Sequence, residues 1–548
     1  MAVTIYNEEG NSRGFNWVTK TNINNSQFQY LLKVDEKNIS SLDWSNAITV
    51  DGVSYDYYDN YRAWRAEVLD LEYGETYYYR VGSINNDSFS KIGSLYINDG
   101  LESLEFIHVS DMQGTTKSHY DMWLKTINAM SSNFKNIDVM LLSGDLADSM
   151  GLQSKANNEM GWLLNGANNY LKDLVLTPAA GNHDTANNIF YAHFNVNLSN
   201  DQDYKWGMYY NYKIGDTEVI VLNTNDDLNN NFRLNSKQVN WFGEVLKNST
   251  AKWKIVVIHE ALISTGKHMN DRSSRYIRED LMPLISEYHV DLVLSGHDHV
   301  YSRSNPYLWD NEEGTMSNQG IEMTLINDNN HLKNYYNTPG TFYVTQNATT
   351  GVEGKRREPS KQTSEPEWFD LATSTINDKY MSYQPDAPTF GHLEIKNNKL
   401  TYSSYYVNNH DELVLFDTFD FIKDVDSNPK VNYLNELIFK AFLQADSDVI
   451  AEIDEQLTLL TAVEKDDVML LTDYYQLRAD YQSKISAIRV VNKIDKLLLT
   501  ADIDTSDIKE ARTLYSVLSD EAKYYVTNYF ILVKLEIEVG MYRRQVSD

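Results

Sequence analysis

The sequence predicts a multidomain protein: an N-terminal β-sandwich, a central α/β region and a small helical module. Three observations support this fold class. A chain of 548 residues is too long for one hydrophobic core. Its hydrophobic content of 42% is ordinary for a folded protein. The spacing of apolar residues changes twice, which places the predicted domains at residues 1–98, 99–424 and 425–548.

The first region has the pattern of short strands. Segments such as "RGFNWVT" and "TYYYRVGS" are rich in aromatic and β-branched residues in alternating order. In "LEYGETYYYRV", Leu71, Gly74 and Tyr77 have the offsets of a tyrosine corner, so the segment resembles that of a fibronectin type III-like sandwich. From the residues alone, another kind of β-sandwich stays possible.

The central region alternates between buried strands and helices. The runs "LEFIHVSD", "IDVMLLSGD", "LVLTPAAGNHD", "TEVIVLNTND", "WKIVVIHE" and "VDLVLSGHDH" are almost continuously apolar. Such runs are typical of strands that are covered on both faces. Segments such as "SHYDMWLKTINAMSSNF" and "SKQVNWFGEVLKNS" between them have helical spacing.

The last region is helical and acidic. Its apolar residues recur at intervals of three and four, as in "LNELIFKAFLQAD". A weak repeat of about 40 residues aligns Ile453 with Ile494 and Tyr475 with Tyr515. The stretch "ARTLYSVLSDEAKYYVTN" resembles helical spacer repeats of bacterial surface proteins, although an unrelated bundle is an alternative. We expect a spacer or a module that binds a protein partner.

Composition excludes several functions. The 48 basic and 78 acidic residues give a formal net charge of −30, which disfavours sequence-specific binding of nucleic acid. The absence of cysteine excludes disulfides, thiolate metal sites and cysteine nucleophiles. No apolar stretch reaches the length of a membrane span. The start "MAVTIYNEEG" has no apolar core of a signal peptide, and we expect that a native signal has been removed.

Metal-type ligands follow the central strands. They are Asp111, Gln113, Asp145, Asn182, His183, His259, His297 and His299. The carboxyl ends of strands in an open α/β sheet share one edge, so we expect these turns to meet. Small residues such as Gly144, Gly181 and Gly296 would allow tight turns there.

Such a set of carboxylates, amides and imidazoles can hold two divalent ions, with Asp145 as the natural bridge. Two ions about 3.5–4 Å apart can clamp an in-line phosphoryl displacement and acidify a bridging water to hydroxide. No protein nucleophile is then needed. No "GxSxG" or "GxxxxGK" motif suggests another chemistry.

These residues resemble the motifs of calcineurin-like metallophosphoesterases. The family pattern is Asp-x-His, Gly-Asp, Gly-Asn-His-Asp/Glu, a lone His and Gly-His-x-His, and four of its five elements stand here intact and in order, over about residues 103–350. The segments "HEALISTGKHMND" and "VDLVLSGHDHVYSRS" resemble the purple acid phosphatase-like branch, whose members carry an N-terminal fibronectin-like domain. The resemblance implies an αββα sandwich.

The resemblance also implies a role for each residue. Asp111, Asp145 and His299 would hold one metal with Gln113 beside it, and Asp145, Asn182, His259 and His297 would hold the other. His183 would stabilise the phosphoryl oxygens or protonate the leaving oxygen. Asp184 would orient His183 or cap a helix. His268 would contact the substrate phosphate, or be a solvated loop residue.

Two positions depart from the family pattern. Gln113 replaces a histidine, and it would either ligate a metal through its amide oxygen or bond to a metal-bound water. Asp148 stands where purple acid phosphatases carry the tyrosine that stabilises ferric iron. It would be a hard ligand or a helix-capping carboxylate. We therefore expect a colourless protein with two divalent ions, of Mn, Fe, Zn, Mg or Ca.

Other polar residues are weaker candidates. Tyr301 and Arg303 follow "GHDH" and could reach a phosphate. Seven further histidines lack a motif and are predicted to be structural or surface residues; they are His108, His119, His193, His289, His331, His392 and His410.

The predicted function is metal-dependent hydrolysis of phosphate mono- or diesters by a metal-bridging hydroxide. The substrate would be a phosphorylated small molecule or a phosphate-ester-bearing glycan, outside or on the surface of a Gram-positive-type bacterium. One alternative is a degenerate, surface-displayed binding protein, which the changes at Gln113 and Asp148 allow. Another is a nucleotidase or nuclease of the same fold.

Overall fold

The computed structural model divides into two compact units, residues 1–322 with 331–423, and residues 323–330 with 424–548. It describes residues 1–32, 42–149, 151–185, 189–197, 207–226, 232–310, 315–318, 322–324, 333–336, 338–349, 382–396, 398–423, 429–443, 447–466, 468, 471–499 and 504–540. All of the predicted site residues lie in these ranges. Among the histidines predicted to be structural or surface residues, His331 lies outside the described residues. Each unit is described by itself.

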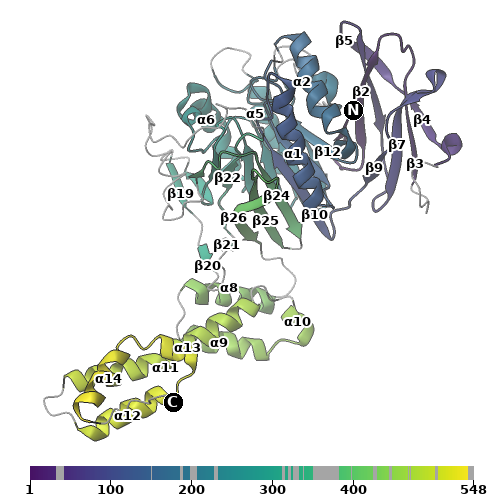
Figure 1. Ribbon diagram of the computed structural model, residues 1–548. Coiled ribbons are helices and arrows are strands. Elements are labelled where there is room, and N and C mark those ends of the chain that lie inside the picture. The colour runs from purple at the N-terminus through teal and green to yellow at the C-terminus, as the bar shows by residue number, and fades with distance from the viewer. Residues whose placement is uncertain are drawn as a thin grey trace. The chain divides into compact units, whose positions relative to one another are not determined.

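The N-terminal region is built from strands, as predicted (Figure 1). They are β1 (Ala2–Ile5), β2 (Arg13–Lys20), β3 (Gln27–Leu32), β4 (Ile48–Asp51), β5 (Val53–Tyr58), β6 (Tyr61–Val68), β7 (Thr76–Ser83), β8 (Ser88–Phe89) and β9 (Gly93–Tyr96). One sheet has the order β4-β3-β7-β8, with β9 on β7. The hydroxyl of Tyr77 accepts a hydrogen bond from the backbone N–H of Glu72 at 3.2 Å, which is the contact that a tyrosine corner makes.

The other N-terminal strands belong to a sheet that continues into the central region. Its order is β21-β26-β25-β24-β10-β11-β12-β1-β2-β6-β5, and the junction is the parallel pair β1–β12, where Thr4 lies opposite Leu176. Its central strands are β10 (Ser103–Val109), β11 (Val139–Ser143), β12 (Val175–Ala179), β21 (Lys333–Tyr336), β24 (Thr389–Lys396), β25 (Lys399–Val407) and β26 (Leu413–Ile422). One core cluster contains residues from both sides of position 98.

A second sheet packs against the central part of the first. Its order is β13-β14-β15-β16-β22-β17-β23. The strands are β13 (Tyr210–Ile214), β14 (Thr217–Val221), β15 (Trp253–Val257), β16 (Leu292–Ser295), β17 (Tyr301–Arg303), β22 (Phe342–Thr345) and β23 (Ser382–Tyr383). A separate hairpin is formed by β18 (Tyr307–Asp310) and β19 (Thr315–Asn318), and β20 is Glu322–Thr324.

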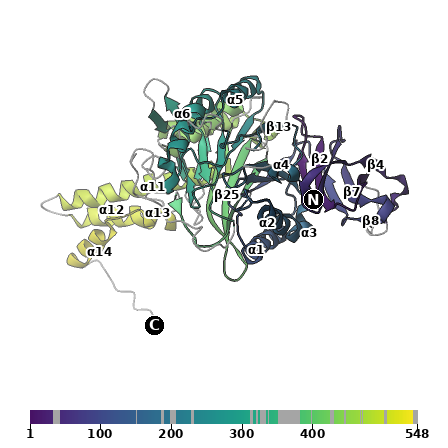
Figure 2. The same cartoon turned by 90° about the horizontal axis from the view of Figure 1, so that it is seen from above.

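Helices cover the outer face of each sheet (Figure 2). On the first sheet lie α1 (Lys117–Asn133) and α2 (Gln153–Gly166), followed by the short α3 (Asn168–Leu171) and α4 (Ile189–His193); on the second lie α5 (Ser236–Asn248) and α6 (Arg272–Glu287). Neighbouring residues of β15 show the layering, because Ile255 and Val257 belong to the core between the sheets and Val256 to the core under α5 and α6. The predicted order of layers, αββα, is confirmed.

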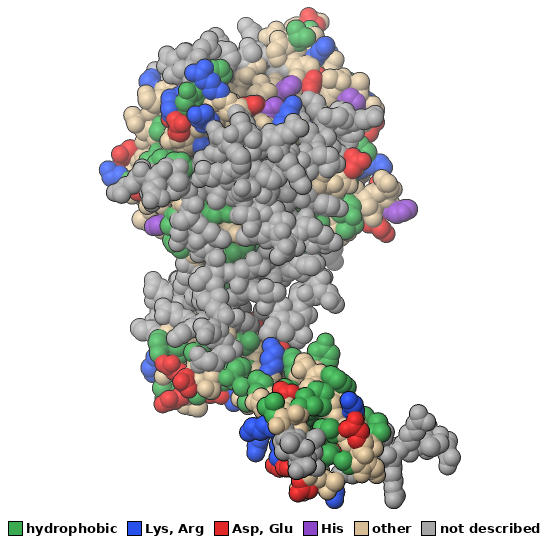
Figure 3. Space-filling model, turned by 90° about the vertical axis from the view of Figure 1, so that its left-hand side faces the viewer, with side chains coloured by type: hydrophobic (Ala, Val, Ile, Leu, Met, Phe, Trp, Pro, Cys, Tyr) green, Lys and Arg blue, Asp and Glu red, His purple; other side chains and the backbone are tan. Residues whose placement is uncertain are grey.

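The second unit is helical, as predicted. Its helices are α8 (Pro429–Leu443), α9 (Ser447–Thr458), α10 (Ala462–Asp466), α11 (Leu471–Leu498), α12 (Thr505–Ser516), α13 (Asp520–Tyr524) and α14 (Tyr529–Glu538). The 28-residue α11 contributes Tyr474 to a core with α8 and α9, and Ile494 to a second core with α12 and α14. Figure 3 shows acidic, basic and hydrophobic side chains mixed on its surface. Within the described residues, no helix has the length and apolarity that crossing a membrane requires.

Candidate metal centre

The predicted ligands come from the ends of two sheets. Asp111, Asp145 and Asn182 follow the neighbouring parallel strands β10, β11 and β12, whereas His259 and His297 follow β15 and β16. The turns meet as expected, but they come from the edges of two facing sheets rather than from the edge of one. The carboxyl ends of parallel strands in the two facing sheets meet, and this brings the five turns together.

Four of these residues have left-handed backbone conformations. The φ angles are +53° at Asp111, +51° at Asp145, +70° at His297 and +53° at His299. Residues other than glycine rarely adopt positive φ, and they do so at a cost in free energy that the surrounding structure must offset. Such strain gathers at functional sites, so its occurrence at four predicted ligands points to selection for side-chain placement.

The first group consists of Asp111, Asp145 and His299, whose ligand atoms all lie within 4.8 Å of one another. All three residues are buried. Nε2 of His299 lies 3.0 Å from Oδ1 of Asp111. The other oxygen of Asp111 accepts from the hydroxyl of Ser110 at 2.6 Å and from the backbone N–H of His297 at 3.0 Å. One oxygen of the Asp111 carboxylate thus faces the group, and the hydrogen bonds to the other oxygen fix its orientation.

The second group consists of Asp145, His259 and His297, again within 4.8 Å. Nε2 of His259 lies 3.3 Å from Oδ1 of Asp145, 3.2 Å from Oδ1 of Asn182 and 3.2 Å from Nδ1 of His297. Nδ1 of His259 donates to the carbonyl of Ser143 at 2.8 Å, so Nε2 is the nitrogen turned toward the other ligands. Asp145 is the only residue shared by the two groups. These are the sets that the family resemblance implies.

The charges of the site fit a cation. Burial opposes ionisation of Asp145, but the neighbouring His259 imidazolium holds the pKa of its carboxyl well below the usual range. Burial likewise disfavours the charged form of His259, yet Asp145 raises the pKa of the imidazole to about 10. Burial and the charge of His259 lower the pKa of His297 well below its usual value. The buried carboxylates therefore stay ionised and are stabilised by a positive charge beside them, which a divalent ion can supply.

Gln113 joins the first group. Its Nε2 lies 3.0 Å from Oδ2 of Asp145 and 3.2 Å from Nε2 of His299. A half-turn of the amide about its last bond exchanges this nitrogen with the carbonyl oxygen. The side chain therefore lies within reach of both predicted roles, direct ligation of a metal and a hydrogen bond to a metal-bound water.

Two glycines make the close approach of the ligands possible. A Cβ on Gly144, which has a φ of +95°, would lie 2.4 Å from Nδ1 of His259. A Cβ on Gly296 would lie 1.7 Å from the hydroxyl oxygen of Ser110 and 2.5 Å from Oδ2 of Asp111. Any side chain at either position would displace a predicted ligand.

His183 lies at the edge of the site and is half-buried. Its backbone N–H donates to Oδ1 of Asp145 at 2.9 Å, and its Nδ1 donates to the carbonyl of Asp148 at 2.8 Å. The Asp148 carboxylate is 3.9 Å from Nδ1 of His183 and belongs to neither ligand group. Asp148 thus lies beside His183 and outside both ligand groups, and the N-cap of α2 is Leu152, so neither the predicted ligand role nor the predicted cap of this helix is seen among the described residues.

Of the two roles expected for Asp184, orienting the His183 imidazole and capping a helix, the contacts of its carboxylate do not support the first. Its carboxylate accepts hydrogen bonds from the backbone N–H groups of Gly181 at 2.9 Å, Leu146 at 3.0 Å and Ala147 at 3.2 Å. These bonds tie the turn after β11 to the turn after β12. Burial and the charge of Asp145 raise the pKa of Asp184 to about 7.

His268 reaches the site from the turn before α6. Its ring centroid lies 4.5 Å from that of His297, and its Nδ1 is 2.6 Å from Oδ2 of Asp271. The backbone N–H of His268 donates to Asp298 at 2.9 Å. His268 is thus placed at the rim of the second group rather than in solvent, and Asp271 holds its ring.

Tyr301 and Arg303 do not reach the site, which corrects their nomination as additional candidates. Both side chains are buried and bind Asp417 of β26: the Tyr301 hydroxyl donates at 2.5 Å, and Nε of Arg303 donates at 2.7 Å. Residues two apart in a strand share a face, and in β17 that face is turned toward β26. The pair is part of the core.

Glu159 was not predicted as a site residue, although its carboxylate holds the loop beside His183. This buried residue of α2 accepts from the backbone N–H groups of Asp148 and Ser149, both at 2.9 Å. It thereby fixes the carbonyl that holds His183. A single acidic residue within a helix is too common to stand out in a sequence.

The predicted structural histidines include His108, which bonds to the hydroxyls of Tyr402 at 2.9 Å and Ser143 at 2.8 Å.

Comparisons with known proteins agree with this arrangement. Residues 104–301 match the calcineurin-like phosphoesterase family, and residues 1–95 match the purple acid phosphatase N-terminal domain. An uncharacterized protein of Mycobacterium tuberculosis is 29% identical over 184 residues, which are 30% of this chain and 34% of that protein. Purple acid phosphatase 21 of Arabidopsis thaliana is 23% identical over 276 residues, which are 46% of this chain and 56% of that protein.

A solved structure shares the fold. The purple acid phosphatase PPD1 from yellow lupin seeds superposes with a TM-score of 0.58 at 15% identity, covering 77% of this chain and 74% of that one. The chain spans about a third of the mycobacterial relative and about half of the Arabidopsis protein.

Proposed function

Because the chain carries a calcineurin-like phosphoesterase domain behind a purple acid phosphatase N-terminal domain, we propose that it hydrolyses phosphate mono- or diesters at a site for two divalent metal ions. The observation that carries the proposal is the pair of ligand groups that meet at Asp145. A carboxylate shared by two groups of three is the arrangement that a dinuclear site needs.

The donor set fits first-row divalent ions. Imidazole and carboxylate ligands suit Zn, Fe and Mn, and the amide oxygens of Asn182 and Gln113 suit Mn, Fe, Mg or Ca. Two such ions would supply an acidified water as the nucleophile and would shield the charge of the phosphoryl oxygens. Asp148 in place of a tyrosine favours a centre without ferric iron, and hence a colourless protein.

The residues beside the metal ligands would handle the proton and the phosphoryl group. Nδ1 of His183 is committed to the carbonyl of Asp148, so Nε2 is the atom that can give a proton to the leaving oxygen. His268, held by Asp271, would donate a hydrogen bond to a phosphoryl oxygen. We propose a phosphorylated small molecule or a phosphate-bearing glycan as the substrate class.

The test is metal stoichiometry by elemental mass spectrometry, followed by hydrolysis of a panel of phosphate mono- and diesters with Mn, Fe, Zn, Mg or Ca. We expect two ions per chain, no visible absorption band, and turnover that is lost on chelation and restored by metal. A protein that holds two ions but hydrolyses no ester would favour the alternative of a binding protein. A protein that holds none and gains no activity with added metal would refute the proposal.

A further inference from the structure

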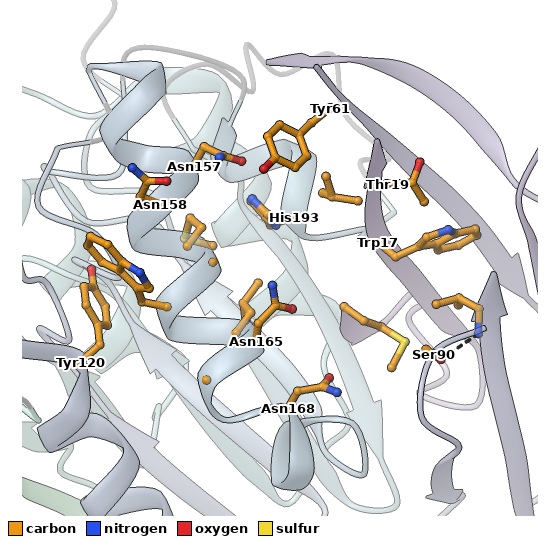
Figure 4. Close-up of a pocket in the computed structure, with 18 of the residues that line it drawn as sticks. Trp17, Thr19, Tyr61, Ser90, Tyr120, Asn157, Asn158, Asn165, Asn168 and His193 are labelled. Atoms are coloured by element: carbon orange, nitrogen blue, oxygen red, sulfur yellow. Dashed lines mark hydrogen bonds between the residues drawn. The ribbon is translucent and has the colours of Figure 1, made fainter. Parts of the chain in front are cut away.

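A cavity of about 730 Å³ lies in the larger unit, away from the metal centre. Its walls are α2 and the neighbouring helices on one side, and strands β2, β6 and the segment around β8 on the other (Figure 4). Neither ligand group contributes a residue to it. The volume is that of a small-molecule or short-oligomer site, in the range of about 300–1,000 Å³.

The lining combines amides with aromatic rings. Four asparagines of α2 and α3 face the cavity; they are Asn157, Asn158, Asn165 and Asn168. Tyr61 faces Asn157 and His193 across the upper part of the cavity in Figure 4, and Trp17 and Thr19 line the opposite strand.

The four amides are available to a ligand. Within the described part of the chain, none of their side chains forms a hydrogen bond to another residue, whereas Asn169 beside them is engaged by Lys91 at 2.6 Å. Each amide presents two donors and an acceptor. The helical wall thus presents the same neutral hydrogen-bonding group from four positions on α2 and α3.

The cavity offers little net charge. Lys117 and Asp121 are its charged side chains, and they form an ion pair with each other at 2.9 Å. His193 bonds to the hydroxyl of Tyr57 at 2.8 Å and is a neutral part of the wall. An anionic or cationic ligand would find no uncompensated partner among these side chains, so the lining disfavours both.

We propose that this cavity binds a neutral oligosaccharide. Sugar rings carry hydroxyls that both donate and accept, which amides match, and apolar C–H faces that lie against aromatic rings. The cavity supplies amides on its helical wall and aromatic rings on its strand wall. This site is independent of the phosphoesterase reaction, since it shares no residue with the metal centre.

The test is binding of neutral tetrasaccharides of glucose, mannose and N-acetylglucosamine to the full chain, by calorimetry and tryptophan fluorescence. The double variant Asn157→Ala/Asn165→Ala should weaken binding by about tenfold or more, since it removes two sets of hydrogen bonds. Alanine is the better helix former, so the variant should fold. Asn128→Ala, on α1 outside the cavity, is the matched control and should bind as the parent does.

Tyr61→Ala should also weaken binding, because it removes a ring at the cavity wall. Hydrolysis of a small phosphate ester should be unchanged in all three variants, so a failure of the phosphoesterase proposal leaves this test intact. The proposal is overturned if no neutral tetrasaccharide binds, if binding requires a phosphate or sulfate group, or if the double variant binds as tightly as Asn128→Ala.

Discussion

The metal centre and the helical module are stabilised in different ways. Around the metal centre, charged groups are buried, four ligands have left-handed backbones, and Asp184 and Glu159 use their carboxylates to tie down loops. The helical module has two small apolar cores, and hydrophobic side chains such as Leu499 and Tyr524 are 87% and 85% exposed. The first region gives up local backbone stability for side-chain placement, whereas in the described part of the second no residue other than glycine has a positive φ.

The largest expected effect of a substitution is at Asp145, the residue shared by both ligand groups. Asp145→Asn keeps the size of the side chain, and asparagine tolerates the positive φ, but the charge between the ions is lost. We expect metal content below two ions per chain and a fall in turnover of about 10³-fold, since metal stabilisation is worth several kcal/mol. The measurements are elemental analysis and the rate of ester hydrolysis.

Asp411→Asn is the matched control for this variant. Asp411 also has a positive φ, +60°, but its carboxylate is exposed and pairs with Lys125 at 3.2 Å. It should keep both metals and full activity. Unchanged turnover in Asp145→Asn would refute the assignment of the site.

A substitution at His183 should reduce catalysis without reducing metal binding. His183→Ala removes the ring held by the Asp148 carbonyl but leaves both ligand groups. Metal content should stay at the parental level while kcat falls by roughly 10²–10⁴-fold, the contribution of a general acid. The exposed His410→Ala should change neither quantity. Loss of a metal in His183→Ala would instead make His183 a ligand.

The two regions should also differ in their response to mild acid. Burial lowers the pKa of His108 from 6.5 to about 3, so the unfolded chain takes up a proton below pH 6.5 that the folded chain refuses. This contribution to stability is present above pH 6.5 and is lost as the pH falls toward 3, at about 1.4 kcal/mol per pH unit. The helical module has no histidine after His410 and lacks this dependence.

Urea unfolding at pH 7 and pH 5.5 measures this difference for the transition of the larger unit. In His108→Gln, the loss of stability between these pH values should be smaller by about 1.3 kcal/mol, whatever the variant does to stability at pH 7. A pH dependence equal to that of the parent would show that folding does not lower the pKa of His108.

The family resemblance was sufficient for the order of layers, and the spaced motifs were sufficient to bring the candidate ligands together, because each of them follows a buried strand. The sequence was insufficient where function depends on contacts between distant elements. Arg303 looked available for phosphate, but its partner Asp417 lies 114 residues away. Asp184 was assigned to its neighbour His183, whereas its bonds go to the turn after β11. Neither contact has a local signature, since a carboxylate does not reveal which backbone it will approach.

The smallest expected effect lies in the helical module. Ser519 caps α13, its hydroxyl accepting from the backbone N–H of Ala522 at 3.2 Å. Ser519→Ala should lower the stability of the helical transition by about 1 kcal/mol, the usual worth of a cap. Ser486→Ala is the matched control, because this hydroxyl bonds to the carbonyl of Gln482 inside α11 and alanine suits a helix interior. Thermal unfolding followed by circular dichroism measures both.

Metal content and turnover should stay constant in Ser519→Ala while only the unfolding transition of the helical module moves, which would show that the module folds independently of the metal centre. A change of turnover in Ser519→Ala would mean that the two regions are coupled.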